Sequence, residues 1–484
     1  MEKTINSKQL KELFVKSGDI VQRPLNIGHK GITVHLFGVD GLMSTLMLDE
    51  TILKPLTLDE NLKDMQTEKE VMEYLLEGGA FHAFTDEVTD YQLLLRYILS
   101  GMAALVFDQE QKALIFDVRD FDKRSITEPS DEGVMKGAKD SFIEVMRTNT
   151  VLIRRRLKSE FLVMEQLNVG KLSKTDITIA YLSNVADMDT VNRVRDTLQN
   201  IDIDNVSTPA FIEEYLVDNK KSIFPQIMYT QRPDRVSANL TDGRVAVVVD
   251  GIPFVYILPC QMVMLMQSPE DYANHFFIGS SLRIIRYIAM ILTIFLPAFY
   301  IAATTYQNQM LPAEIALSIQ KAKQNVPFSS ASEVLGLLVS FEILIEAGLR
   351  LPKTVGTAMS ILGGLVVGQS AVEAKLVSPT VVVIVALAGI AGFILPNQDL
   401  SSGIRLTRFI MAVLAAIGGF FGMTAGLILL ITHLCSLDNY GVAYMSPFVD
   451  VEKSNHKDTL FRFPIKYFTK RSKKIAPENR TKQK

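Results

Sequence analysis

The stretch that decides the fold is residues 284–306, which read IIRYIAMILTIFLPAFYIAATTY. Apart from Arg286 near its start, this run carries no charged side chain. About twenty apolar residues in a helix are enough to cross the hydrocarbon core of a bilayer. The run therefore predicts a first membrane crossing. It also divides the chain into a long polar part before it and an apolar third after it.

Four further apolar stretches follow this run. They cover residues 334–349, 355–372, 377–395 and 409–434. An isolated strand cannot satisfy its backbone hydrogen bonds in lipid, so these stretches are expected to be helices or half-helices packed on one another. The stretch 334–349 is the shortest and the most polar, and we predict that it is re-entrant or interfacial. Residues 307–324 have the pattern of an amphipathic helix that lies in the interface plane.

The flanks of the apolar third set its expected orientation. The first thirty residues contain no apolar core and are therefore not a secretory signal. The residues after Tyr444 are rich in Lys and Arg, which favours the cytoplasmic side. Both ends of the chain are then expected in the cytoplasm, and the number of crossings must be even. We predict about four crossings plus one re-entrant or interfacial helix.

The polar part is expected to be an α/β region in two subdomains. β-branched apolar runs predict strands at residues 32–36, 103–107, 113–118, 177–181 and 245–249. Helical periodicity favours helices at residues 69–76, 90–99, 141–146 and 191–198. Pro, Ser and Gly mark residues 128–137 as a possible link between the subdomains. No internal repeat is evident.

These patterns give a predicted domain order. It is an N-terminal α/β subdomain at 1–130, a second α/β subdomain at 131–275, an all-α multi-pass membrane domain at 276–437 and a short basic cytoplasmic tail at 438–484. The end of that tail, from Lys470 onward, is polar and is expected to lack fixed structure.

The composition excludes several classes of function. The chain has 484 residues and a formal net charge of −3, which gives no case for a nucleic-acid partner. Its only two cysteines, Cys260 and Cys435, lie far apart, and its six histidines are not at metal-ligand spacing. Phosphate-binding loops and hydrolase motifs are missing. We therefore expect neither a cofactor nor a metal, and no enzyme activity.

Two carboxylates in the stretch 334–349 are the first candidates for an ion path. Glu342 and Glu346 are four residues apart and share one helix face. Carboxylates in a membrane segment are costly and usually face a cavity, a partner or an ion path. Arg350 offers an alternative for Glu346, because it follows in the favourable acid-first order. Gln369 is a third candidate, although such amides more often bond a neighbouring helix.

Glycines recur at four-residue spacing in two of the apolar stretches. They are Gly364 and Gly368 in one stretch, and Gly418, Gly422 and Gly426 in the other. On a continuous helix this spacing forms a stripe along which another helix can approach closely. We expect these residues to serve helix packing, within the subunit or between subunits. A gate or hinge is the alternative.

Separated motifs carry a resemblance to a known family. In the polar part they are TN at 148–149, LIRRR at 152–156, SIFPQ at 222–226, RPDR at 232–235, GRVA at 243–246, DGIPF at 250–254 and SPEDY at 268–272. In the apolar third they are FE at 341–342, EAGLRLP at 346–352, SP at 378–379 and HL at 433–434. Together, from about Val134 onward, they resemble the A subunits of the spore germinant receptors of endospore-forming bacteria.

The resemblance implies more than the residues do. It implies a subunit of the spore's inner membrane with two partners, a permease-like B subunit that senses nutrient and a lipoprotein C subunit. It also implies that A subunits assemble into a homo-oligomeric, ligand-gated ion channel in membrane lipid. In such a ring, Glu342 would form an acidic ring that favours monovalent cations.

Some positions depart from the family pattern. Gln231 stands where the family commonly has Glu, and Ile345 where Arg is frequent. The residues Asn439 to Tyr444 differ from the family's usual sequence after HL. The chain is then a receptor A subunit proper or a sporulation-expressed accessory relative. A non-conducting scaffold is the main alternative function. A secondary transporter is less favoured, because no matching halves are evident.

Overall fold

The structure is a computed structural model that describes residues 4–28, 31–79, 85–120, 132, 134, 136–206, 208–350, 368–449 and 455–483. The chain forms two compact units. The α/β unit comprises Met1–Asp218, Ile227–Pro259 and Thr469–Lys484, and the helical unit comprises Asn219–Gln226 and Cys260–Phe468. The chain therefore passes between the units four times. The predicted domain boundaries remain predictions.

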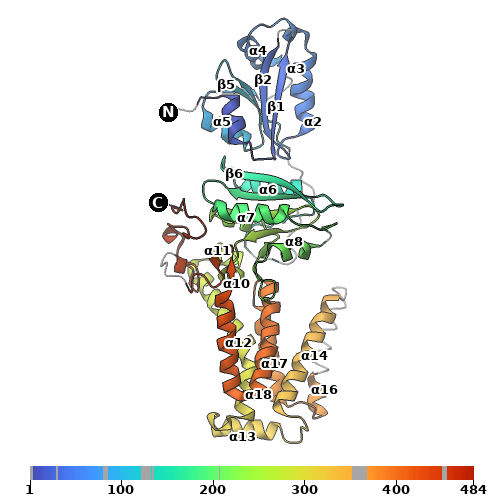
Figure 1. The fold of residues 1–484 in the computed structure, drawn as a ribbon, viewed down its shortest axis with the longest axis vertical. Helices are drawn as coiled ribbons and strands as arrows, with labels where there is room; N and C mark the ends of the chain where they lie inside the picture. The colour runs from blue at the N-terminus through green and yellow to red at the C-terminus, as the bar shows by residue number, and fades with distance from the viewer. Residues whose placement is uncertain are drawn as a thin grey trace. The chain divides into compact units, whose positions relative to one another are not determined.

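The first sheet of the α/β unit is antiparallel, in the order β1-β2-β4-β5-β3. Its strands are β1 (Ile20–Ile27), β2 (Ile32–Val39), β3 (Thr85–Val88), β4 (Ala103–Phe107) and β5 (Lys112–Phe116). Its helices are α1 (Ser7–Leu13), α2 (Thr45–Leu48), α3 (Lys54–Leu58), α4 (Glu68–Tyr74) and α5 (Tyr91–Ile98). Figure 1 shows these helices around the sheet.

Both faces of this sheet are covered, which explains why its central strand, β4, is apolar throughout. Along β4, Ala104 and Val106 belong to a core shared with α1 and α5. The alternate residues Leu105 and Phe107 belong to a second core shared with α2, α3 and α4. This is the two-residue side-chain period of a strand that is buried on both sides.

The second sheet repeats the topology of the first. Its antiparallel order is β6-β7-β9-β10-β8, which is the same order of first, second, fourth, fifth and third strand. Its strands are β6 (Leu162–Val169), β7 (Thr175–Leu182), β8 (Met228–Thr230), β9 (Val245–Val249) and β10 (Val255–Leu258). Its helices are α6 (Met146–Arg156), α7 (Met188–Gln199), α8 (Pro209–Leu216) and α9 (Pro233–Thr241). The expectation of no repeat was wrong at the level of topology.

Most of the strands and helices predicted for the α/β unit are confirmed, and two predictions are wrong. The five predicted strands are confirmed as β2, β4, β5, β7 and β9, and three predicted helices as α4, α5 and α7. The predicted helix at 141–146 is wrong. The Asn149 side chain bonds both the backbone N–H and the carbonyl of Ile143, at 2.9 and 2.6 Å, and α6 begins only at Met146. The predicted disorder from Lys470 is also wrong, because Arg471 donates to the carbonyl of Thr241 (2.6 Å).

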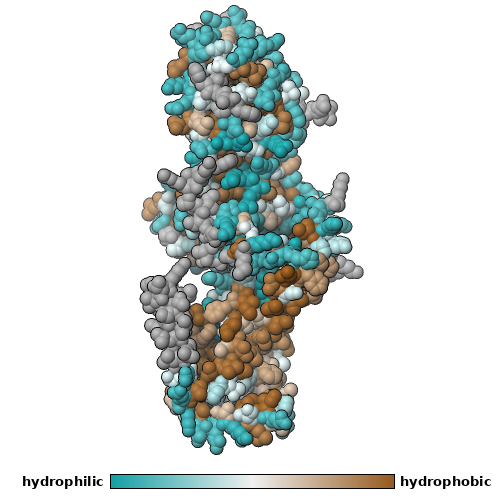
Figure 2. Space-filling model, turned by 180° about the vertical axis from the view of Figure 1, so that it is seen from behind, coloured by the Kyte–Doolittle hydropathy of each residue, from teal (hydrophilic) through white to brown (hydrophobic). Residues whose placement is uncertain are grey.

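The helical unit is built around long apolar helices. These are α12 (Phe276–Thr305), α14 (Ser330–Arg350), α17 (Pro379–Phe393) and α18 (Gln398–Ser436), with the short α10 (Met262–Met266), α11 (Pro269–Ala273), α13 (Ala313–Ala322) and α16 (Gly368–Glu373). α12 packs against α17 and α18 (Figure 1). Among the described residues, α12 and α18 are long and apolar enough to cross a membrane, and α17 is a shorter apolar helix. Hydrophobic side chains gather on the surface of this unit (Figure 2).

The last apolar stretch is not one span, because α18 reverses direction at Gly419. Gly419 has φ 58° and ψ −139°, which lies outside the helical region. Beyond it, a Cβ at Gly426 would lie 2.7 Å from side-chain atoms of Met411 and Leu414. Residues this far apart in sequence meet only if the chain doubles back. The stretch 409–434, predicted as one crossing, therefore contains the end of one arm and most of the next.

The stretch 334–349 is longer as a helix than its apolar run suggests. α14 is a continuous helix of 21 residues, or about 30 Å at the usual rise per residue. The length argument against a crossing here is therefore wrong. Within the stretch 307–324 a helix is confirmed as α13, and its position in the interface plane remains a prediction. Residues 355–367 of the second apolar stretch lie outside the described residues.

The loop between α8 and β8 belongs to the helical unit. Ser222 Oγ lies 3.0 Å from Nε2 of His433, near the end of α18, and the ring of Phe224 lies 6.1 Å from the His433 ring. Asn439 donates to the carbonyl of Cys260 at 3.1 Å. The SIFPQ and HL motifs, more than two hundred residues apart, thus meet in one place.

Candidate functional site

The candidate site is a cluster of charges between α14 and the first arm of α18. Glu342 Oε1 accepts a hydrogen bond from Nη2 of Arg408 at 2.6 Å, and its Oε2 accepts one from Nη1 of Arg405 at 3.1 Å. Arg405 also donates to Ser402 Oγ at 2.9 Å. The two arginines are three residues apart and so share one face of α18. We call Glu342, Arg405 and Arg408 the charge cluster.

Arg408 is the most deeply buried member of the charge cluster. Its side chain is 0% exposed, whereas that of Glu342 is 28% exposed. It lies ten residues into α18, or about 15 Å from the start of the helix. Its Nε and Nη1 atoms, and Nε of Arg405, have no partner among the residues that the structure describes. The cluster therefore carries one excess positive charge and spare donors inside an apolar bundle.

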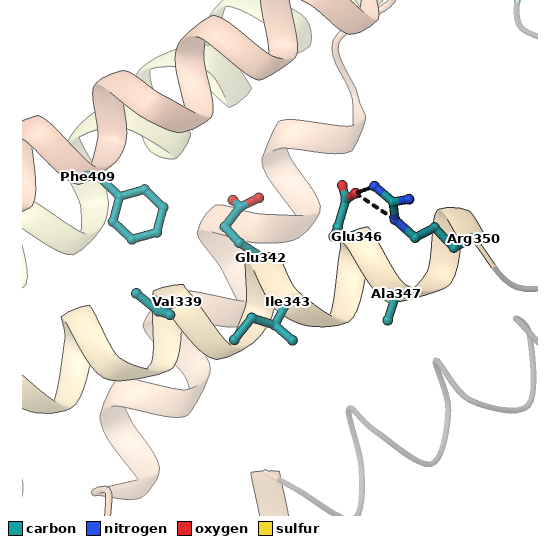
Figure 3. Close-up of a pocket in the computed structure, with 7 residues that line it drawn as sticks. All are labelled: Val339, Glu342, Ile343, Glu346, Ala347, Arg350 and Phe409. Carbon is teal, nitrogen blue, oxygen red and sulfur yellow. Dashed lines mark hydrogen bonds and ion pairs between the residues drawn. The ribbon is translucent and has the colours of Figure 1, made fainter.

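Glu346 lies in a different environment, one turn further along α14. Its Oε1 accepts from Nε and Nη2 of Arg350, at 3.0 and 2.6 Å, and both side chains are exposed. This is the alternative that the sequence offered for Glu346. Figure 3 shows Glu342 and Glu346 pointing to the same side of α14.

A groove of about 550 Å³ lies along α14, and Figure 3 shows the residues that line it. Its lining combines the two carboxylates with apolar side chains and comprises Val339, Glu342, Ile343, Glu346, Ala347, Arg350 and Phe409. Phe409 comes from α18, next to Arg408. The charge cluster therefore stands beside an open apolar groove and is not enclosed by it.

The third ion-path candidate lies apart from this groove. Gln369 is exposed on the short helix α16, and its Nε2 donates to Glu373 Oε1 at 3.1 Å. The described residues thus do not bring Gln369 together with Glu342. Its role in an ion path remains a prediction.

The predicted glycine stripes take different forms. Gly364 lies outside the described residues, and a Cβ at Gly368 would make only an ordinary contact with Val382. Gly418 stands before the reversal of α18, whereas Gly422 and Gly426 stand after it and pack on the first arm. The three glycines do not form one stripe, because a stripe at this spacing requires a continuous helix.

Two glycines outside the predicted four-residue series also make close helix contacts, which the spacing rule missed. A Cβ at Gly389 of α17 would collide with the ring of Phe341 on α14, at 2.5 Å. A Cβ at Gly419 would lie 2.7 Å from Gln307 and 2.9 Å from Tyr306, at the end of α12. The Tyr306 hydroxyl donates to the carbonyls of Ala416 and Ile417, at 3.0 and 2.8 Å. Tyr306 therefore satisfies backbone acceptors where the first arm ends.

A second buried carboxylate holds the start of α17. Glu333, in the first turn of α14, is almost completely buried, and its Oε2 accepts the backbone N–H of Ser378 at 2.7 Å. Lys323 lies 3.6 Å from its other oxygen. A carboxylate at a helix N-terminus is stabilised by the free N–H groups and the helix dipole. Glu333 therefore links α14 to α17.

Sequence reasoning missed both arginine partners of Glu342. It began the last apolar stretch at Phe409, just after Arg408, and so counted neither arginine as part of a membrane helix. A signal was present, because Asn is a common N-cap residue. In the structure Asn397 caps α18 and accepts from the N–H of Leu400 at 2.8 Å. A helix that begins there includes Arg405 and Arg408.

Comparison with known proteins decides the family. The model of the Bacillus/Clostridium GerA spore germination proteins matches residues 8–474. The chain belongs to this GerA family. Spore germination protein KA of Bacillus subtilis (strain 168) is 36% identical over 480 residues, which is 99% of this chain and 87% of that protein. The resemblance stated from the motifs is confirmed.

Two further spore germination proteins are similar to this chain over more than three quarters of its length. Spore germination protein A1 of Bacillus subtilis is 37% identical over 369 residues, 76% of this chain and 77% of that protein. Spore germination protein GerLA of Bacillus cereus is 33% identical over 402 residues, 83% of this chain and 82% of that protein. The crystal structure of the N-terminal domain of the A subunit of the Bacillus megaterium spore germinant receptor GerK3 has 25% identity and a TM-score of 0.42. It covers 54% of this chain and 99% of that chain.

Proposed function

We propose that this chain is the A-type membrane subunit of a spore germinant receptor. In this proposal, copies of it form or gate an ion channel that opens on nutrient sensing and releases monovalent cations. Membership of the GerA family supports the receptor role. The charge cluster, which places Glu342 against a fully buried Arg408 inside an apolar helical unit, is the observation that carries the channel role.

The proposed topology follows from the helices. α12, α17 and the two arms of α18 cross the membrane, and α14 forms the additional segment. Large apolar side chains on these helices are exposed, including Ile288, Val383 and Phe421. Such a surface is stable in lipid and not in water. The number of these crossings is even, which places both termini on one side, and the Lys- and Arg-rich residues after Tyr444 favour the cytoplasmic side.

The charge balance changes the role that we propose for Glu342. In the described arrangement its carboxylate faces two arginines, so a ring of such clusters would be basic and would not by itself favour cations. We propose instead that Glu342 holds α14 against α18 in the closed state, through its ion pairs with Arg405 and Arg408. Nutrient sensing would shift an equilibrium between this closed arrangement and an open one in which the groove side of α14 is rearranged. The preference for cations rests on the family alone.

The partners belong to the same proposal. They are a permease-like B subunit, a lipoprotein C subunit, membrane lipid and further copies of this chain, in the inner membrane of the spore. Cross-linking of intact spore membranes, followed by identification of the linked chains, tests this set. Recovery of the chain only as an isolated monomer would contradict it.

The alternative is a non-conducting scaffold that organises receptor clusters, and glycine-mediated helix packing is consistent with it. Purified full-length chain in liposomes loaded with potassium separates the two. The channel proposal predicts potassium efflux that changes in the Glu342→Gln variant and not in Glu314→Gln, an exposed acid on α13. The absence of flux from liposomes that contain the complete receptor, with nutrient present, would favour the scaffold.

A further inference from the structure

The segment at residues 457–467 is fixed to the beginning of α12; we call it the tail loop. The backbone N–H of Arg462 donates to Ser280 Oγ at 3.0 Å, and that hydroxyl donates to the carbonyl of Arg462 at 3.1 Å. Asp458 accepts from Arg283 Nη1 and from the Tyr272 hydroxyl, both at 2.6 Å. All of these partners lie in α11 or in the first turns of α12.

The tail loop is also closed on itself. The backbone N–H of Phe463 donates to the carbonyl of Lys457 at 3.1 Å, and Lys457 Nζ donates to the carbonyl of Tyr467 at 3.0 Å. Nη1 of Arg462, which is buried, reaches back to the carbonyl of Asn274 at 2.9 Å. The loop is therefore a compact structure held at one level along α12.

The outer surface of the tail loop is unusually apolar. Five of its large hydrophobic side chains are between 38% and 58% exposed; they are Leu460, Phe461, Phe463, Ile465 and Tyr467. Single exposed hydrophobic residues are ordinary, but five within eight residues, three of them aromatic, mark an interaction surface. Asp458 and Arg462 of the loop instead face α11 and α12, through bonds to Arg283, Tyr272 and the carbonyl of Asn274.

The position along α12 at which the tail loop is bonded indicates what covers the apolar surface of the loop. Exposed apolar residues on α12 begin with Phe277 and Ile278 and continue with Ile285 and Ile288. The loop is bonded to Ser280, within the first of these turns. Tyr and Trp are enriched where a membrane helix enters the headgroup region, and Phe and Leu are common on the apolar face of segments that lie in that interface. Asp458 is paired with Arg283, whereas Lys466 is exposed and suits a lipid phosphate.

We propose that the tail loop is an interfacial membrane anchor, with the lipid surface at the N-terminal end of α12 as its partner. Phe461, Phe463, Ile465 and Tyr467 insert at the boundary between headgroups and acyl chains, and Lys466 lies among the phosphates. The anchor holds the chain at the bilayer surface just before it returns to the α/β unit at Thr469. This inference rests on the proposed membrane location of α12.

The chain contains no tryptophan, so one introduced residue gives an unambiguous fluorescence signal. The test uses full-length chain in liposomes of phosphatidylcholine brominated either near the headgroup or near the middle of the acyl chain. Three single variants are compared: Phe461→Trp in the tail loop, Ile288→Trp on α12, and Leu172→Trp in the exposed turn between β6 and β7. Phe463→Trp replaces Phe461→Trp if the latter does not fold.

The anchor predicts that bromine near the headgroup lowers Phe461→Trp emission by about twofold, in keeping with an interfacial position. It also predicts that Ile288→Trp is quenched by the deeper bromine, and that Leu172→Trp is quenched by neither lipid. If Ile288→Trp is quenched but Phe461→Trp behaves like Leu172→Trp, the anchor is refuted and the membrane location stands. If Ile288→Trp is not quenched either, the proposed membrane subunit itself is refuted.

Discussion

Two buried arginines, one in each unit, show how differently the two parts of the molecule use charge. Arg154, on α6, donates from Nε and Nη2 to Asp19, both at 2.8 Å, and from Nη1 to the carbonyl of Leu162 at 3.0 Å. Arg408, on α18, donates from Nη2 to Glu342, and its other two nitrogens have no partner among the described residues. Both side chains are 0% exposed.

The difference separates a structural pair from one that can rearrange. The attraction within a buried ion pair offsets the cost of desolvating both charges only when its geometry is good and its remaining donors are satisfied. Arg154 meets that condition and ties helix α6 to the start of β1. Arg408 does not, and Glu342 has a second arginine available. We therefore propose that the charge cluster, and not the pair of Arg154 with Asp19, is the part that rearranges between two states.

The largest effect is expected from breaking the satisfied pair. Arg154→Met leaves Asp19 buried without a counter-charge, and we expect it to lower the free energy of unfolding by about 3–5 kcal/mol. Thermal unfolding of the full-length chain measures this. The control is Arg193→Met, which removes an exposed pair with Asp218 and is expected to cost about 1 kcal/mol or less. Equal losses in the two variants would contradict the role given to Arg154.

The second effect concerns the reversal of α18. Gly419→Ala introduces a Cβ at positive φ and against Tyr306 and Gln307, and we expect a loss of about 2–4 kcal/mol from strain and crowding. The matched control is Gly418→Ala, where a Cβ meets only Phe421 at 4.0 Å. The thermal stability of the two detergent-solubilised variants is the measurement. If Gly419→Ala is as stable as Gly418→Ala, the reversal is not where the structure places it.

A smaller loss of stability is expected at the unsatisfied arginine. Arg408→Met removes unpartnered donors and leaves Arg405 to balance Glu342, so we expect a cost of about 1–2 kcal/mol, below that of Arg154→Met. Its effect on nutrient-triggered ion release should nevertheless exceed that of Arg154→Met at matched protein levels. If Arg408→Met lost more stability than Arg154→Met, or altered ion release less, the contrast drawn between the two arginines would be wrong.

The smallest effect is expected at Glu346. Glu346→Gln breaks an exposed i,i+4 pair with Arg350, which contributes about 0.3–0.5 kcal/mol. Stability should therefore be nearly unchanged. Ion flux in liposomes decides whether this residue also lines a path. A change in flux without a change in stability would assign Glu346 to the path, and unchanged flux would leave the pair with Arg350 as its role.

How much the sequence predicts depends on the kind of signal. Strands such as β4 and β9 are buried on both faces, so their unbroken apolar runs identify them. β1 and β8 lie at sheet edges, and their mixed composition hides them. The repeated strand order is invisible in the sequence because it lies in the topology.

In the candidate site too, the sequence predicts what lies along one helix and misses what helix packing brings together. Glu342 and the pair of Glu346 with Arg350 follow from spacing along one helix. The partners Arg405 and Arg408 lie more than sixty residues away, and only packing of α14 on α18 brings them together. The single stripe expected of Gly418, Gly422 and Gly426 is absent for a related reason, although Gly422 and Gly426 do pack on the first arm of α18. A stripe requires a continuous helix, and the glycine that breaks the helix, Gly419, does not belong to the four-residue series.

The most direct test of the central claim is nutrient-triggered potassium release from spores that carry Glu342→Gln or Glu342→Ala. Glu314→Gln serves as the control, and the protein level is measured in each strain. Both Glu342 variants are expected to alter the release, because the ion pairs between α14 and α18 are lost, whereas the control is expected to match the unmodified chain. Normal release at normal protein level in both Glu342 variants would contradict it.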